Sequence, residues 1–172
     1  MLTERKITPS SSDYNQFISL YRSAFPKEER VPLEYLIGDY EENSLIACYE
    51  EDNFCGFYST LTFGDITHIL FLAINENLRG HGYGSTVLNL ISSHFSHNRI
   101  ILDIEAEDQT APNNNQRIRR KAFYERNGYH ESGIEYIWHG VPYKIMIKNG
   151  SITEQEFDDF WDNLDTMRKK SL

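Results

Sequence analysis

Hydrophobic and polar residues follow one another in the N-terminal part of the chain in a pattern that predicts one strand and two helices. Residues 6–9 read as a short first strand, and the Ser12-Asp13 pair is a candidate cap for the next element. From Tyr14 onwards apolar residues recur at helical spacing until Pro26 ends the helix. Pro32 can open a second, shorter helix.

Three runs rich in β-branched and aromatic residues come next, and each predicts a strand. They cover residues 44–49, 54–63 and 66–74. The turn-forming pairs Asp52-Asn53 and Gly64-Asp65 separate them. Because such pairs favour tight hairpins, we expect antiparallel neighbours in this region.

Helices and strands alternate in the second half of the chain. The first helix there has an apolar face made of Val87, Leu88, Leu90, Ile91 and Phe95. A strand at 99–104 and a basic helix at 116–127, which Gly128 ends, follow it. Two strands at 129–136 and 141–147 complete the pattern, with a turn at His139-Gly140 between them.

This order of elements predicts a protein of the α/β (α+β) class. We expect a mixed, mostly antiparallel sheet of about six or seven strands, about four flanking helices, and one more helix at the C-terminus. Residues 1–150 form the expected domain, and residues 151–172 are appended to it. In that appendage an apolar stripe recurs at helical spacing, which predicts docking on its own domain or on a second subunit and leaves a homodimer open. The stripe consists of Phe157, Phe160, Trp161 and Leu164.

Charge and cysteine content narrow the function. The chain has 172 residues with 17 Lys and Arg against 26 Asp and Glu, a net charge of −9. Such a charge repels nucleic acid and attracts cationic substrates. We expect neither a membrane span nor a signal segment, because the longest apolar run, 69–74, is short and the N-terminus is polar. Cys48 and Cys55 lie in strand-like runs, which favours buried thiols and a cytoplasmic location.

A glycine cluster between a predicted strand and a predicted helix carries the candidate chemistry. It reads Arg79-Gly80-His81-Gly82-Tyr83-Gly84. Glycines let backbone N–H groups approach an anion, and a helix N-terminus favours negative charge, so the cluster is typical of a pyrophosphate site. A glycine-rich turn without a ligand is the alternative. A dinucleotide-binding fold does not fit the antiparallel strands, and no Gly-Lys-Ser/Thr closes the cluster.

The loop and the element order resemble the GNAT acetyltransferase superfamily. Arg79, Gly82 and Gly84 fill the three defined positions of its Arg/Gln-x-x-Gly-x-Gly/Ala signature. A second family segment, aromatic-Tyr-x-x-x-Gly-aromatic, resembles residues 123–129. The resemblance implies an enzyme that moves the acetyl group of acetyl-CoA to an amine, by direct attack within a ternary complex. No metal is expected, because the six histidines show no paired ligand spacing beyond His94 and His97, which read as a polar helix end.

The same resemblance assigns the cofactor contacts. Backbone groups of the strand before the loop would hold the pantetheine arm, and loop amides would hold the pyrophosphate. These are Leu72, Ala73 and Ile74 for the arm, and Arg79, Gly80, His81, Gly82, Tyr83, Gly84 and Ser85 for the pyrophosphate.

Tyr124 matches the tyrosine that often protonates the departing thiolate in this family, and a phenol suits that task at neutral pH. The alternative is a core aromatic beside Phe123. The chain departs from the family where Asn and Ala are common, because Ile118 and Arg120 occupy those positions. A basic cluster on this helix could meet CoA phosphates instead, or form a solvated face. It consists of Arg117, Arg119, Arg120, Lys121 and Arg126.

Two residues are candidates for the general base. His68 stands eleven residues before the signature, where histone-type relatives place a glutamate, and histidine exchanges protons near neutral pH. Glu105 ends the next strand, on the side opposite Leu102 and Ile104. A water relay is the third reading.

The acceptor is sought in the segment between the first two helices, where the family usually shapes its acceptor pocket. Phe25, Glu28 and Glu29 are the candidate contacts, and the two carboxylates could attract a cationic amine. A small molecule and a peptide both fit as acceptors. The alternative function is a non-catalytic module that binds acyl-CoA and regulates or recruits a partner.

Overall fold

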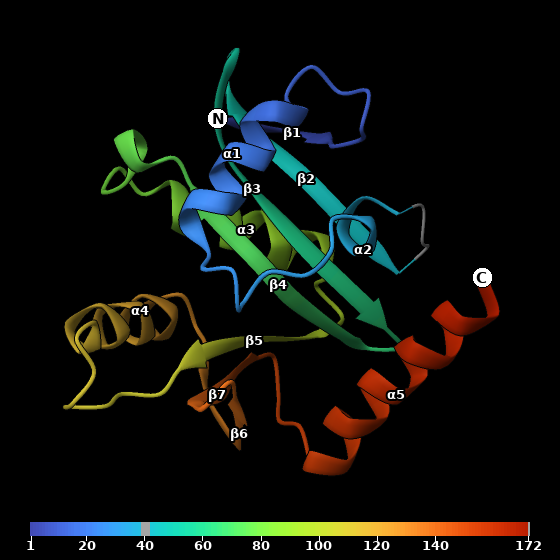
Figure 1. Ribbon diagram of the computed structural model, residues 1–172, viewed down its shortest axis with the longest axis vertical. Helices are drawn as coiled ribbons and strands as arrows, with labels where there is room; N and C mark the ends of the chain where they lie inside the picture. The colour runs from blue at the N-terminus through green and yellow to red at the C-terminus, as the bar shows by residue number, and fades with distance from the viewer. Residues whose placement is uncertain (39–41, 172) are drawn as a thin grey trace. The chain divides into compact units, whose positions relative to one another are not determined.

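The computed structural model describes residues 1–38 and 42–171. These residues form a mixed sheet of seven strands in the order β1-β2-β3-β4-β5-β7-β6, and five helices (Figure 1). The chain divides into two compact units, Met1–Thr62 with Ile69–Ser96, and Phe63–His68 with His97–Leu172. Strand β4 (Ile66–Ile74) therefore contributes its first three residues to the second unit and the remainder to the first. The predicted fold class is confirmed.

In the first unit, helices cover both faces of the strands β1 to β3. Its other elements are β1 Leu2–Lys6, α1 Tyr14–Ala24, α2 Glu34–Ile37, β2 Asn43–Glu50, β3 Asn53–Phe63 and α3 Tyr83–His94. Strand β2 pairs antiparallel with both β1 and β3. Figure 1 shows α1 and α2 on one side of β2 and β3 and α3 on the other. On that second face Tyr83 and His94, one from each end of α3, bond to Glu50 and Glu4.

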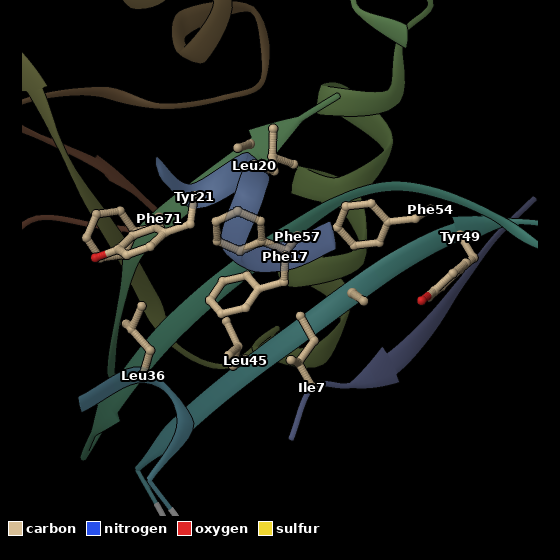
Figure 2. Close-up of a cluster of buried hydrophobic side chains, with 12 residues drawn as sticks. Ile7, Phe17, Leu20, Tyr21, Leu36, Leu45, Tyr49, Phe54, Phe57 and Phe71 are labelled. Atoms are coloured by element: carbon tan, nitrogen blue, oxygen red, sulfur yellow. The ribbon is translucent and has the colours of Figure 1, made fainter. Parts of the chain in front are cut away.

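The core of the first unit is aromatic (Figure 2). The ring of Phe17 on α1 meets Phe57 of β3 edge-on, with centroids 4.8 Å apart. The ring of Tyr21, one helical turn further, meets Phe71 of β4 at 5.1 Å. These residues have the three- to four-residue spacing that predicted the helix, so the amphipathic pattern and the packing agree.

The second unit is an antiparallel sheet with two helices. Its elements are β5 Arg99–Glu105, α4 Asn114–Arg126, β6 His130–Trp138, β7 Val141–Lys148 and α5 Glu154–Ser171. Strand β7 pairs with both β5 and β6. His139 and Gly140 both have positive φ, at 49° and 76°, as the predicted hairpin turn requires.

Helix α5 docks on its own chain. Phe160 and Leu164 of the predicted stripe are buried, and Phe157 stacks on Tyr136 of β6 with centroids 6.4 Å apart. The ring of Trp161 lies 5.1 Å from the ring of His68. The apolar stripe was expected to dock either on its own domain or on a second subunit. In the structure it packs on the second unit of its own chain.

A capping box and a salt bridge fix the start of α5. The backbone N–H of Glu156 donates to Thr153 Oγ1 at 3.1 Å, and the N–H of Thr153 donates to Glu156 Oε2 at 3.0 Å. Arg99 donates to the same Oε2 at 2.9 Å and binds both carboxylate oxygens of Asp65. The Thr153 N–H, and after it Arg99, lowers the pKa of Glu156 below its usual 4.5.

Three local predictions need correction. The first strand is Leu2–Lys6 and not 6–9, because residues 2–6 pair with β2 and a turn between Thr8 and Ser11 begins soon after them. Asp13 stands at the N-cap of α1 but makes no capping bond, since its carboxylate accepts from the hydroxyl of Tyr49. The turn predicted at Asp52-Asn53 lies one residue earlier, with Glu51 at φ 55°.

Both cysteines are buried free thiols, as the sequence predicted. Burial, more than any neighbouring charge, raises the pKa of Cys48 to about 12. Within the described ranges, none of the helices is long and apolar enough to span a membrane.

We predict that Thr153→Ala lowers the free energy of unfolding by about 1 kcal/mol, because it deletes the oxygen that caps α5. Guanidinium titration followed by circular dichroism measures the change. Ser151→Ala is the matched control, since it removes an exposed hydroxyl from the same segment. Equal stabilities for the two variants would contradict the capping role.

Candidate active site

The glycine cluster forms an open loop between β4 and α3. A short 3₁₀ turn, Glu76–Leu78, leads into it, and Gly80 and Gly82 both have φ 82°. A Cβ atom built on either glycine would meet nothing within 4 Å. Left-handed backbone therefore explains the two glycines, and the space around them is clear for a ligand to approach.

The N-terminus of α3 is available to an anion. Gly82 is its N-cap and contributes no side-chain bond, so the first-turn N–H groups of residues 83–85 are not capped in the usual way. The hydroxyl of Tyr83 donates to Glu50 at the end of β2, which fixes the helix start and raises the pKa of Tyr83 to about 12. Arg79 is exposed and donates from Nε to the carbonyl of Ile74 at 3.3 Å. Such an arrangement can bind a diphosphate.

Strand β3 touches the end of β4 at Gly56. A Cβ on Gly56 would lie 2.2 Å from the carbonyl oxygen of Ala73 and 3.0 Å from Cα of Ile74. Asn75 extends the contact, because its backbone N–H donates to Cys55 O at 2.8 Å and its side chain to Phe54 O at 2.7 Å. The position of the predicted pantetheine segment thus depends on a glycine that sequence reasoning missed. Gly56 lies inside a run that predicts a strand, and a glycine at such a position often marks the close approach of another backbone segment.

Glu105 lies within an ion-pair network at the start of α4. Its Oε2 is 2.8 Å from Arg117 Nη2, and its Oε1 is 3.5 Å from Arg120 Nη1. Arg117 is only 8% exposed, and it also donates to the carbonyl of Ala106 and to the side chain of Asn113. The network attaches α4 to the end of β5.

This network divides the basic cluster of α4. Arg117 and Arg120 face Glu105, and Lys121 lies between Glu107 and Glu131, 3.6 Å from a carboxylate oxygen of each. Arg119 and Arg126 are exposed, as expected of a solvated face. The structure therefore gives Arg117 a role in attaching α4 to β5. The sequence analysis had considered only contact with CoA phosphates or a solvated helix face for this residue.

Tyr124 lies half-buried among aromatic rings on α4. The rings of Phe123 and Tyr129 are 5.1 Å and 5.8 Å from it. Burial raises the pKa of Tyr124 above its ordinary 10.0, and the nearby charge of Arg120 opposes this shift only in part. The hydroxyl is therefore a protonated donor at neutral pH. The hydroxyl of Tyr129 is buried and finds no hydrogen-bond partner in the described part of the chain.

His68 is fully buried beneath α5. Its Nε2 lies 3.3 Å from Oδ1 of Asp103 on β5, and the rings of Phe160 and Trp161 pack against it at 6.1 Å and 5.1 Å. The other oxygen of Asp103 accepts from the hydroxyl of Tyr136 at 2.9 Å. The sequence analysis did not assign a role to Asp103. It lies two residues before Glu105 on the same strand, so both side chains point to the same face of the sheet.

The segment after α1 is fixed by Tyr21. Its hydroxyl donates to Val31 O at 3.1 Å and accepts from Val31 N at 2.8 Å. Phe25 ends α1 and packs its ring on Phe71 at 4.9 Å, which is a core contact. Glu28 is exposed and Glu29 is half-buried, in the turn that follows.

The predicted site residues fall into two groups. The first unit holds the loop, Leu72 to Ile74 and the Phe25–Glu29 segment, and the second unit holds His68, Glu105 and Tyr124. Among residues 1–38 and 42–171, no three His, Cys, Asp or Glu side chains gather as a metal site would require.

Solved structures share this fold. A Bacteroides thetaiotaomicron protein assigned as an acetyltransferase of the GNAT family is 23% identical, with a TM-score of 0.78 over 95% of this chain and 96% of that one. The ribosomal-protein-S18-alanine N-acetyltransferase of Escherichia coli is 16% identical, with a TM-score of 0.65 over 89% and 96%. A Bacillus subtilis acetyltransferase in complex with CoA is 15% identical, with a TM-score of 0.62 over 87% and 99%.

No sequence among the curated proteins matches the chain. The model of the acetyltransferase (GNAT) family matches residues 14–129, which include both the glycine loop and Tyr124. This match extends over more than half of the chain, and the fold agrees with it, so the protein belongs to the GNAT acetyltransferase family.

Proposed function

We propose that the protein transfers an acetyl group from acetyl-CoA to a primary amine, by direct attack in a ternary complex. The observation that carries this proposal is the open glycine loop at the uncapped N-terminus of α3. Open space at the two glycines and a positive helix end without a side-chain cap fit a pyrophosphate, so the residues present suit CoA. The Bacillus subtilis neighbour, which contains CoA, supports the same reading.

The cofactor contacts follow from the loop. The amides of residues 79–85 would hold the pyrophosphate, and the backbone of Leu72, Ala73 and Ile74 would hold the pantetheine arm. Acetyl-CoA supplies an activated acyl group as a thioester. No metal has a part in this proposal.

Tyr124 is the proposed general acid. Its raised pKa keeps the hydroxyl protonated at neutral pH, and a thiolate needs one proton as it leaves. A proton donor that stays protonated serves this step over the whole neutral range.

His68 and Glu105 are the candidates for taking the proton from the acceptor ammonium. Glu105 has a guanidinium group beside each of its carboxylate oxygens, which supports a holding role. His68 has the carboxylate of Asp103 3.3 Å from Nε2, and this neighbour is the observation that supports the role of proton acceptor.

The proposed acceptor is a small-molecule or peptide amine, with Phe25, Glu28 and Glu29 near its entrance. The net charge of −9 favours a cationic amine and disfavours nucleic acid. The Escherichia coli neighbour, named as an alanine N-acetyltransferase of a ribosomal protein, supports nitrogen as the acceptor atom. Two buried free thiols support a cytoplasmic location.

A screen of amine acceptors with CoA thiol release as the readout tests the proposal. Polyamines, aminoglycosides, lysine side chains and peptide N-termini are offered with acetyl-CoA, and a reaction without acceptor serves as the blank. Acceptor-dependent thiol release supports the enzyme. Tight CoA binding by calorimetry without release from any acceptor would instead support the acyl-CoA-binding module.

We predict that Gly56→Ala weakens acetyl-CoA binding at least ~10-fold. A Cβ 2.2 Å from Ala73 O must displace the end of β4, where the pantetheine arm is proposed to bind. Calorimetry measures the dissociation constant. Gly64→Ala is the control, because its φ of 58° costs stability while its Cβ meets nothing within 4 Å. Unchanged affinity in folded Gly56→Ala would argue against this contact.

We predict that Tyr124→Phe lowers kcat at least ~10-fold and leaves the dissociation constant of acetyl-CoA unchanged. Because burial raises the pKa of Tyr124, the alkaline loss of wild-type activity should fall above pH 10, and the variant should lack it. Steady-state kinetics and calorimetry measure both. Tyr129→Phe is the matched control, since its hydroxyl has no hydrogen-bond partner among the described residues. Wild-type turnover in Tyr124→Phe would make this residue a packing aromatic.

A further inference from the structure

A carboxylate on strand β2 holds the first residue of α3. The hydroxyl of Tyr83 donates to Oε2 of Glu50, the last residue of β2. Tyr83 begins α3 and directly follows Gly82, the N-cap in the glycine loop. This hydrogen bond lies within the first unit, which also contains the loop and the segment from Leu72 to Ile74. Glu50 itself lies outside both family motifs.

The alternation of side chains along β2 explains why Glu50 reaches α3. Leu45, Ala47 and Tyr49 pack in the aromatic core with α1, so the residues between them point to the opposite face of the sheet. Glu50 continues this second series at the end of the strand. Figure 1 shows α3 on that face, on the side of β2 and β3 away from α1. The carboxylate therefore meets the helix from its sheet-facing side and not from its end.

The other end of α3 is held in a similar way. His94, the last residue of the helix, has Nε2 2.6 Å from Oε2 of Glu4 on β1. Tyr58 of β3 donates to the other oxygen of Glu4, also at 2.6 Å. Glu4 pairs with Cys48, two residues before Glu50, so both carboxylates lie on the same face of the sheet. One carboxylate thus fixes each end of the helix.

The bond to Glu50 fixes the helix start without using the N–H groups there. An ordinary N-cap side chain accepts from one of the first-turn N–H groups, which makes that group unavailable to a ligand. Gly82 provides no such side-chain bond, and glycine leaves the loop before the helix with much conformational freedom. Helix ends without support fray. A bond from the side keeps the first turn ordered while its N–H groups stay directed at an anion.

We propose that Glu50 is a positioning residue for the diphosphate of CoA: it holds Tyr83, and Tyr83 holds the first turn of α3 in the orientation that binds the anion. This inference rests on the proposed function, because it concerns the same cofactor site. The pantetheine arm is proposed to bind at a different place, the end of β4. The pair therefore contributes to the affinity for the diphosphate and not to that for the arm.

Binding of CoA and of pantetheine, which lacks the diphosphate and the nucleotide, tests this role. Calorimetry measures the dissociation constant of CoA, and amide shifts in ¹H–¹⁵N NMR spectra measure the weaker binding of pantetheine. We expect Tyr83→Phe and Glu50→Ala each to raise the dissociation constant of CoA about 10-fold, as the loss of one charge-assisted hydrogen bond would. Both variants should bind pantetheine as wild type does.

A conservative variant and a double variant test whether the hydrogen bond is the cause. Glu50→Gln keeps an oxygen that accepts from the phenol, so we expect it to bind CoA within about 3-fold of wild type. The combination of Tyr83→Phe with Glu50→Ala should weaken CoA binding no more than either change alone, because both remove one shared bond.

Glu4→Ala is the matched control. It releases the opposite end of the same helix by deleting the carboxylate that binds His94 and Tyr58. We expect it to lower the free energy of unfolding and to leave the dissociation constant of CoA unchanged. Guanidinium titration and calorimetry measure the two quantities.

Several outcomes would overturn the positioning role. Unchanged CoA affinity in folded Tyr83→Phe would show that the bond has no part in binding. Failure of Glu50→Gln to restore binding would contradict the hydrogen bond as the cause. Equal weakening in Glu4→Ala, or equal weakening for pantetheine, would make the pair a general support of the fold. If Glu50→Ala fails to fold, Tyr83→Phe decides, because it removes only one oxygen from a half-buried side chain.

The wild-type protein separates this inference from the proposed function. Wild type that binds no CoA overturns both together. Wild type that binds CoA but acetylates no amine overturns the enzyme alone, and the variants still decide the role of Glu50. Wild-type transfer with CoA affinity unchanged in the variants overturns the positioning role alone.

Discussion

The contact between Gly56 and Ala73 is the constraint on which the proposed cofactor site depends. Because β3 comes so close that a Cβ would lie 2.2 Å from the Ala73 carbonyl, the two strands leave no room for a side chain at residue 56. Asn75 then bonds to the carbonyls of Phe54 and Cys55, and the chain leaves the strand into the glycine loop. In that loop Gly80 and Gly82 have left-handed backbone, and the hydroxyl of Tyr83 donates to Glu50 at the start of α3.

In the second unit, charged groups are held in two different ways. Glu105 is bound by two guanidinium groups, and the result is a closed ionic connection between β5 and α4. Asp103, two residues earlier, has one hydroxyl and one imidazole as neighbours, so it is less fully compensated.

Helix α5 is fixed at its first turn and covers a buried side chain further along. Its capping box and Arg99 fix where the helix begins, and its apolar stripe then covers His68. The family match ends at residue 129, before this helix. The helix that covers His68 is therefore outside the segment that identifies the family.

The sequence by itself determined the order of helices and strands, the positions of most turns, the glycine loop and the family. These features are local, because periodicity, positive φ and motif spacing act over a few residues. Only the tertiary structure decided that Gly56 touches Ala73, that Arg117 is buried against Glu105, and that Asp103 lies beside His68 under α5. Each of these contacts joins residues from different elements. The pairing of strands and the docking of helices set such distances, and the spacing of residues along one segment determines neither of them.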